Sequence, residues 1–145
     1  MIVWRDLSLQ HPRGPLLRFP DLRLEAGRVL LLRGASGTGK SSLLALLAGL
    51  LTPTTGEIEV DGTPLHRLSP RQRDAWRAAR LGVLPQRLHL SESLSVADNL
   101  ALVDVAVGRP VDRRAIAHVL QALGVSHLAA CRPPALSGGE AQRVA

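Results

Sequence analysis

Residues Gly34-Ala35-Ser36-Gly37-Thr38-Gly39-Lys40-Ser41 are the most informative stretch of this sequence. They match the pattern G-x-x-x-x-G-K-[ST] at every fixed position. The apolar run Val29–Leu32 comes before them, and the leucine- and alanine-rich run Lys40–Leu51 comes after. This order predicts a buried parallel strand, a glycine-rich turn and then a buried helix.

A turn of this composition is suited to binding phosphate, because glycines let the backbone wrap an anion without Cβ clashes. We expect Lys40 to reach the terminal phosphates of a nucleotide and Ser41 to supply a hydroxyl ligand to Mg²⁺. Lys40 is the only lysine in the chain, and arginine stands at every other cationic position. Because an ammonium and a guanidinium are not interchangeable, this exception indicates a chemical requirement at Lys40.

The remaining elements follow from periodicity and capping residues. We expect strands over residues 1–9 and over Glu57–Gly62, the second of them half-exposed, and a short apolar strand over Leu81–Leu84. Helices are expected after the N-cap residues Ser69, Ser95 and Asp112, with the first reaching about Arg80, and a further helix is expected to start at Glu140.

Composition narrows the classes of function. The chain has 145 residues, is 46% hydrophobic and 21% charged, and so has the balance of one globular domain. Its net charge of +6 comes from scattered arginines without the clustering of a nucleic-acid face, so no nucleic-acid partner is expected.

Cys131 is the single cysteine and fits a reducing compartment. The longest apolar run, Leu43–Leu51, is too short to span a bilayer. Four of the five histidines lack the spacing of metal ligands: His66, His89, His118 and His127.

A phosphate loop alone indicates an NTPase of unspecified kind, and two later motifs choose among the kinds. Gln86 ends the apolar run Leu81–Leu84. Leu136-Ser137-Gly138-Gly139-Glu140 follows and leads into Ala141-Gln142-Arg143-Val144-Ala145. The order of phosphate loop, glutamine and this signature resembles the ABC-type ATPase family over nearly the whole chain.

The resemblance implies an α/β fold: a P-loop NTPase core, an antiparallel β subdomain near both ends of residues 1–65, and a helical subdomain. We expect residues 1–145 to form a partial ABC ATPase domain. Within it, residues 1–86 would hold the nucleotide-binding core and β subdomain, residues 87–136 the helical subdomain, and residues 137–145 the start of the signature helix.

The resemblance also implies roles for individual residues. Lys40 and Gln86 would serve catalysis, and Ser41 and Gln86 would hold Mg²⁺. The signature would contact ATP held by a second subunit through Leu136, Ser137, Gly138, Gly139 and Glu140. The nucleotide would be bound by Gly34, Ala35, Ser36, Gly37, Thr38, Gly39, Lys40, Ser41, Ser42 and His11. Three of these positions depart from the family pattern: Glu140 replaces glutamine, Ser42 replaces threonine, and His11 lies where an adenine-stacking aromatic is usual. For His11 the alternative of an ordinary exposed loop histidine stays open.

By resemblance, the chain is expected to be the ATP-binding subunit of an ABC transporter, most similar to the lipoprotein-release and macrolide-export type. ATP and Mg²⁺ would be its cofactors. A homodimer or a paired ABC ATPase subunit and an integral membrane permease would be its partners, at the cytoplasmic face of the cell membrane. Two alternatives are a soluble ABC protein acting on nucleic acid or ribosomes, and a non-catalytic remnant of a broken gene.

The sequence ends at Ala145, one turn into the expected signature helix, which suggests C-terminal truncation. The second acidic motif of the family is not among the 145 residues. Since water activation and Mg²⁺ binding in the family use that motif, we expect this chain alone to be inactive as an ATPase.

Overall fold

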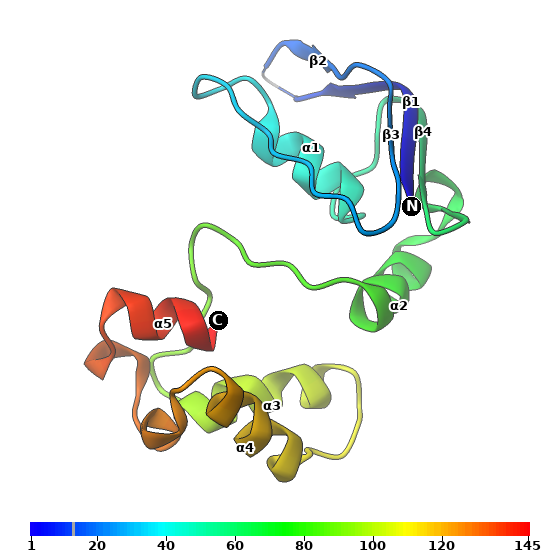
Figure 1. Ribbon diagram of the computed structural model, residues 1–145. Helices are drawn as coiled ribbons and strands as arrows, with labels where there is room; N and C mark the ends of the chain where they lie inside the picture. The colour runs from blue at the N-terminus through cyan, green and yellow to red at the C-terminus, as the bar shows by residue number, and fades with distance from the viewer. Residues whose placement is uncertain (13) are drawn as a thin grey trace. The chain divides into compact units, whose positions relative to one another are not determined.

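A computed structural model of the chain describes residues 1–12 and 14–145. These residues form two compact units, an N-terminal unit over Met1–Gly82 and a C-terminal unit over Val83–Ala145. The N-terminal unit combines an antiparallel sheet with helices, and the C-terminal unit is helical (Figure 1). Each unit has its own hydrophobic core.

The sheet of the N-terminal unit is built around the long strand β1, Ile2–Gln10. One edge of β1 pairs with two short strands, β2 (Leu16–Arg18) and β3 (Leu22–Leu24), and the other edge pairs with β4 (Thr55–Val60). The strand β5, Thr63–Pro64, extends the sheet beyond β4. Every pairing is antiparallel, which confirms the antiparallel β subdomain expected from the sequence.

The pairing of β1 with β4 shifts register between Arg5 and Ser8, where Asp6 adopts a positive φ of 47°. Opposite this bulge stands Gly56, with φ of 89°. A Cβ at position 56 would lie 2.4 Å from the carbonyl oxygen of Arg5. Only glycine therefore allows the two backbones to approach this closely.

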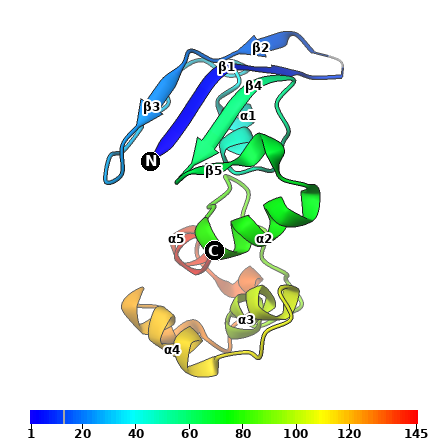
Figure 2. The ribbon, with the colours of Figure 1, turned by 90° about the vertical axis from the view of Figure 1, so that its right-hand side faces the viewer.

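Helix α1, Lys40–Leu47, covers one face of this sheet (Figure 2). Its buried side chains Leu43 and Leu46 join Trp4, Leu7 and Ile58 in the core of the N-terminal unit. The expected helix over Lys40–Leu51 was therefore too long, and Leu44 and Leu50 are exposed rather than buried.

Helix α2 spans Pro70–Arg80, as its N-cap predicts. Ser69 accepts a hydrogen bond from the Gln72 amide, and the Gln72 side chain accepts one in return from the Ser69 amide, so both halves of a capping box form. The Arg77 guanidinium donates to the carbonyl oxygen of Gly49 at 3.0 Å, just beyond the C-terminal end of α1. A cation at this end is favourable because it meets the negative pole of the helix.

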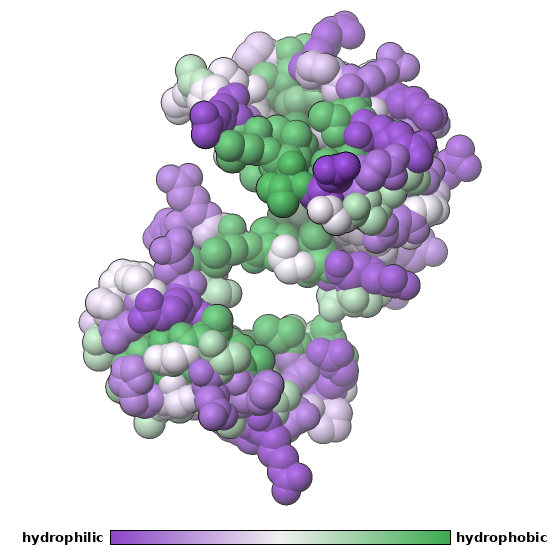
Figure 3. Space-filling model, in the orientation of Figure 1, coloured by the Kyte–Doolittle hydropathy of each residue, from purple (hydrophilic) through white to green (hydrophobic). Residues whose placement is uncertain are grey.

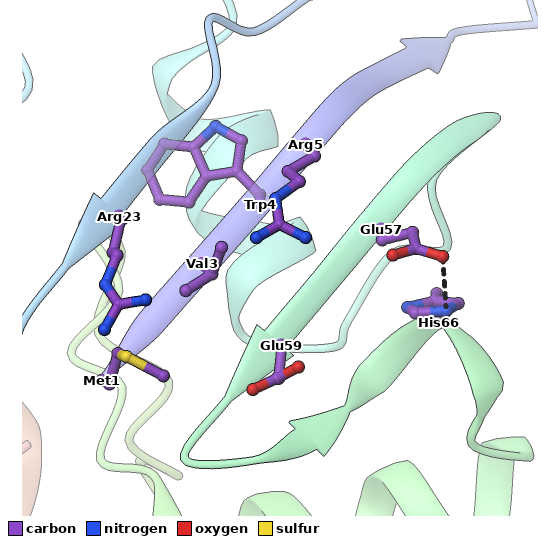
Figure 4. A pocket seen from close by; sticks show the side chains of 8 residues that line it. All are labelled: Met1, Val3, Trp4, Arg5, Arg23, Glu57, Glu59 and His66. Atoms are coloured by element: carbon purple, nitrogen blue, oxygen red, sulfur yellow. Dashed lines mark ion pairs between the residues drawn. The ribbon is translucent and has the colours of Figure 1, made fainter.

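The other face of the sheet carries charged side chains (Figure 4). Here Arg5 lies opposite Glu57 in register, and Val3 lies opposite Glu59 and Arg23. The Nε2 atom of His66 lies 3.9 Å from Glu57 Oε1, at the rim of a shallow hollow of about 100 Å³. The sheet is thus two-faced, with apolar side chains toward α1 and charges away from it.

The C-terminal unit contains helices α3 (Val96–Ala106), α4 (Arg113–Ala122) and α5 (Gly138–Val144), with three-residue 3₁₀ turns at Ser126–Leu128 and Pro133–Ala135. As expected, Ser95 caps α3 and Asp112 caps α4. Buried members of this core are Val96, Ala101, Ile116, Leu120, Val125, Leu128 and Val144.

Two expected strands do not form. Residues Val29–Leu32 and Leu81–Leu84 have extended or irregular backbone without ladder partners among the described residues. Val29 is 94% exposed and Leu84 57% exposed, so these segments contribute to the hydrophobic surface seen on the molecule (Figure 3). A strand needs backbone partners, and no strand of the described part supplies them, so the predictions of a buried parallel strand over Val29–Leu32 and of a short apolar strand over Leu81–Leu84 were wrong.

Candidate nucleotide site

The phosphate loop ends where α1 begins, and glycine is required at that junction. Gly39 is the N-cap of α1 with φ of 89°, and Gly37 has φ of 84°. A Cβ at position 39 would lie 2.9 Å from Leu17 Cδ1 and 3.4 Å from Phe19 Cε1. The loop therefore packs at Gly39 against Leu17 of β2 and against Phe19, and the sequence did not predict this contact.

The loop closes around the Lys40 side chain. The Nζ atom of Lys40 donates to the carbonyl oxygens of Gly34, at 2.9 Å, and Ala35, at 2.6 Å. The Thr38 hydroxyl donates to Ala35 O at 3.0 Å and braces the same turn. A positive charge is thereby fixed inside a glycine-rich loop at the N-terminus of a helix, where an anion is favoured.

Backbone donors are available beside this charge. Within residues 1–12 and 14–145, no acceptor is found for the N–H groups of Gly37, Thr38 and Gly39. Ser36 and Ser41 are exposed on either side of them, and a Cβ at Gly37 would meet nothing within 4 Å. Unpaired donors, hydroxyls and an ammonium around an open loop fit the phosphate groups of a nucleotide.

His11 reaches this region from the end of β1. Its Nε2 atom lies 3.2 Å from the hydroxyl oxygen of Ser42, in the first turn of α1. The backbone of His11 is fixed in turn, since its carbonyl oxygen accepts hydrogen bonds from the Gly14 amide and the Gln10 side chain. The structure thus brings His11 into contact with Ser42, one of the predicted site residues, within the N-terminal unit.

Gln86 belongs to the C-terminal unit. It is exposed and lines an open hollow of about 390 Å³ together with Gly138 and Gln142. Gln142 was not singled out as a site residue, although it belongs to the run that follows the signature. Two side-chain amides and a helix start share this hollow, so it offers donors and acceptors for a polar ligand.

The signature segment forms the start of α5. Ser137 is its N-cap, and the helix begins at Gly138, two residues before the predicted start at Glu140. The Glu140 carboxylate accepts from the Ser137 amide at 2.8 Å and from the Ser137 hydroxyl at 2.7 Å. These bonds, with smaller contributions from His127 and Arg143, hold the pKa of Glu140 below its usual range. The placement of Glu140 three residues after Ser137 is typical of a capping box.

Metal-binding side chains do not cluster in the described part of the chain. No group of three His, Cys, Asp or Glu side chains that could hold a metal ion occurs in residues 1–12 and 14–145. Ser41 and Gln86, the two expected Mg²⁺ ligands, lie in different units. Nor is any described helix both long and apolar enough to cross a membrane.

Comparison with known proteins places this geometry in a family. A family model described as ABC transporter matches residues 17–145. The chain is 37% identical over 151 residues to the lipoprotein-releasing system ATP-binding protein LolD 1 of Rhodopirellula baltica, covering 100% of this chain and 66% of that protein. It is 43% identical over 143 residues to the hemin import ATP-binding protein HmuV of Bordetella avium, covering 97% of this chain and 53% of that protein. The chain thus spans between half and two thirds of the length of these relatives.

Solved structures share the fold. The dimeric ATP-binding cassette MJ0796 in a post-hydrolysis state with ADP and phosphate superposes with a TM-score of 0.86 at 24% identity, covering 99% of this chain and 66% of that one. A second dimeric structure of the same cassette gives a TM-score of 0.85 at 25% identity. These likenesses confirm the mixed α/β fold expected from the motifs.

Proposed function

The chain belongs to the ABC transporter family, and we propose that it is an ATP-binding subunit that couples ATP hydrolysis to transport through separate permease subunits. Its relatives are named as ATP-binding proteins of lipoprotein-release and hemin-import systems. Those names agree on nucleotide binding and differ in cargo. We assign the choice of cargo to the permease.

The observation that carries the proposal is the loop around Lys40. Its ammonium sits against the carbonyl oxygens of Gly34 and Ala35, beside unpaired N–H groups of the loop. In the proposed complex the ammonium turns to the β- and γ-phosphates of ATP, and the loop N–H groups bind the phosphate oxygens. Lys40 would then stabilise the charge that develops on the β-phosphate of the departing ADP when water attacks the γ-phosphorus.

Ser41 and Gln86 are the proposed Mg²⁺ ligands. Both side chains are exposed, and each has an oxygen of the kind that Mg²⁺ prefers. Mg²⁺ would neutralise charge on the phosphates when bound. Ser41 would bind Mg²⁺ through its hydroxyl in the first turn of α1, and Gln86 would bind it through its amide oxygen.

The signature is proposed to act in a pair of subunits. Ser137, Gly138 and Gly139, flanked by Leu136 and Glu140, would contact the γ-phosphate of ATP bound to the opposing subunit. The solved structures of the similar cassette are dimeric, which supports this arrangement. Pairing on an integral membrane permease would place the subunit at the inner face of the cell membrane, with no role for nucleic acid.

Turnover by the natural gene product tests the proposal. We expect Mg²⁺-dependent ATP hydrolysis that Lys40→Ala abolishes, because the mutant loses the phosphate-binding cation. The 145-residue polypeptide alone is expected to bind ATP without hydrolysing it, since the second acidic motif of the family is not among its residues. Equal turnover by the gene product and its Lys40→Ala variant would refute the assignment.

A further inference from the structure

Hydrogen bonds between Ser137 and Glu140 bear on how the signature can meet a nucleotide. We propose that the Glu140 carboxylate competes with the γ-phosphate of ATP for the Ser137 hydroxyl proton, and thereby limits the nucleotide-dependent pairing of subunits. This inference rests on the proposed contact of the signature in trans, and it concerns the regulation of that contact.

The first support is that both donors of Ser137 are already used. Its hydroxyl donates to Glu140 Oε2 at 2.7 Å, and its amide donates to the same oxygen at 2.8 Å. A serine hydroxyl carries a single proton. Ser137 therefore cannot donate to a phosphate oxygen for as long as its hydroxyl donates to Glu140.

The second support is the charge of the acceptor. Hydrogen bonds from the Ser137 hydroxyl and then from its amide hold the pKa of Glu140 below its usual range, so the carboxylate is ionised at neutral pH. A γ-phosphate that approaches the same hydroxyl would be repelled by this charge, because both groups are anions. A neutral amide in the same place would accept the hydrogen bonds without the repulsion.

The third support is that a ligand can reach the hydroxyl. Ser137 and Gly138 are both exposed. A Cβ at Gly138 would meet nothing within 4 Å, so the space beside the Ser137 hydroxyl is open. Access to this serine is therefore limited by its bond to Glu140 rather than by packing.

The fourth support is a second partner for the carboxylate. The Nε2 atom of His127 lies 3.9 Å from Glu140 Oε1, the oxygen that Ser137 does not use. An imidazole that donates from Nε2, or that carries a charge, attracts a carboxylate. Arg143, three residues along α5, adds a further positive charge near Glu140. A turn of the Glu140 side chain toward these groups would release the Ser137 proton for a phosphate.

Sedimentation of the natural gene product tests the inference, with Mg²⁺ and the β,γ-imido analogue of ATP as the ligand. Glu140→Gln removes the charge and keeps a side-chain acceptor. We expect it to lower the dissociation constant of the nucleotide-dependent dimer by about tenfold, since a repulsion between charges a few ångströms apart is lost. Glu92→Gln removes the same charge from an exposed position of the same unit and should leave the dimer unchanged.

A double-mutant cycle tests the release toward His127. His127→Ala should raise the dissociation constant of the dimer about threefold, as loss of one exposed charge partner predicts. The same change should have no effect in the Glu140→Gln background, because no carboxylate is left there to attract. Equal effects in the two backgrounds would contradict a release of the proton through His127.

Ionic strength distinguishes charge repulsion from an effect on the helix. Raising the NaCl concentration from about 0.05 M to about 0.5 M screens exposed charges. The difference in dimer affinity between the unmodified protein and Glu140→Gln should then shrink. A difference that stays the same would come from the capping of α5 and would overturn the inference.

Ser137→Arg separates this inference from the function on which it rests. An unchanged or weaker dimer in Glu140→Gln, with the dimer abolished in Ser137→Arg, would overturn only the competition by Glu140. A dimer that persists in Ser137→Arg, or that forms in none of these proteins, would defeat the proposed contact in trans itself.

Discussion

The Nζ atom of Lys40 lies 2.6 Å from the carbonyl oxygen of Ala35, inside the loop that precedes its own helix. A short charge-assisted hydrogen bond of this kind holds the lysine side chain folded back over the loop. A nucleotide phosphate would compete with two carbonyl oxygens for the same ammonium. The side chain at position 40 must therefore be compact enough to serve both partners.

Lys40→Arg should not be conservative. The planar guanidinium is larger than an ammonium and directs its donors in a rigid fork, so it cannot occupy the same point between Gly34 and Ala35. We expect the affinity for Mg·ATP to fall by about tenfold or more, as loss of one charge-assisted contact predicts. Isothermal titration calorimetry measures this, with Arg33→Lys as the control at an exposed neighbouring position. Equal affinities in Lys40→Arg and the unmodified chain would contradict the expected size limit.

Gly39→Ala should damage the loop more than the same change elsewhere. At Gly39 the backbone has a φ of 89°, which is strained for alanine. A Cβ there would also lie only 2.9 Å from Leu17 Cδ1. Gly62 is the matched control, since its φ is 75° and nothing lies within 4 Å of a Cβ there. Strain alone should cost about 1–2 kcal/mol in the free energy of unfolding at either position.

Urea denaturation and nucleotide titration of the two glycine variants distinguish the effect of backbone strain from the effect of the contact with Leu17. Gly39→Ala should be the less stable variant and should lose nucleotide affinity, whereas Gly62→Ala should bind nucleotide normally. If both variants lose the same stability and bind nucleotide alike, the contact between the β2 region and the loop has no consequence.

Acidification should loosen the start of α5. Hydrogen bonds from the Ser137 hydroxyl and amide hold the pKa of Glu140 below its usual range. A carboxyl with a lowered pKa stabilises the folded segment above its unfolded pKa, and this stabilisation is lost as the pH falls through the folded pKa. The protection factor of the Ser137 amide, which compares its exchange with the intrinsic rate at the same pH, should fall over that acidic range. Glu140→Gln removes the titration and keeps an acceptor, so the protection factor in that variant should depend less on pH in the same range. An identical profile in both proteins would show that Glu140 does not control the segment.

Ser137→Arg should prevent nucleotide-dependent pairing of subunits. In the proposed arrangement its bulk occupies the place where the γ-phosphate of the opposing subunit approaches. Sedimentation of the natural gene product with a slowly hydrolysed ATP analogue should show a dimer that the variant cannot form, while ATP binding at Lys40 stays nearly intact. Ser126→Arg, at another exposed serine of the C-terminal unit, is the control. A persistent dimer in Ser137→Arg, or loss of nucleotide binding by its monomer, would exclude contact in trans.

Local signals in the sequence predicted the helices well. The caps at Ser69, Ser95 and Asp112 each stand directly before the helix that they predict. A cap and a proline at the first helical position act within one turn, so they can be read without knowing the rest of the fold. The phosphate loop was recognised for the same reason, because all its fixed positions lie within eight residues.

Contacts between distant residues were not predicted. Val29–Leu32 has the composition of a buried strand, but a strand also needs partners, and these are not specified within the run itself. The bond between His11 and Ser42 joins residues 31 positions apart, and the contact of Gly39 with Leu17 joins the loop to β2. Sequence patterns located the loop, whereas its neighbours depend on how the chain folds around it.

Calorimetric titration of Mg·ATP into the full chain and into Lys40→Ala is the most direct test of the claim that the loop Gly34–Ser41 binds nucleotide. We predict saturable binding of one nucleotide per chain, weakened by about tenfold to a hundredfold in Lys40→Ala because a charged hydrogen-bond donor to phosphate is lost. Arg33→Ala, which removes a neighbouring exposed charge, should leave the affinity nearly unchanged. Equal affinity in Lys40→Ala and the unmodified chain, or no binding by the unmodified chain, would contradict the account.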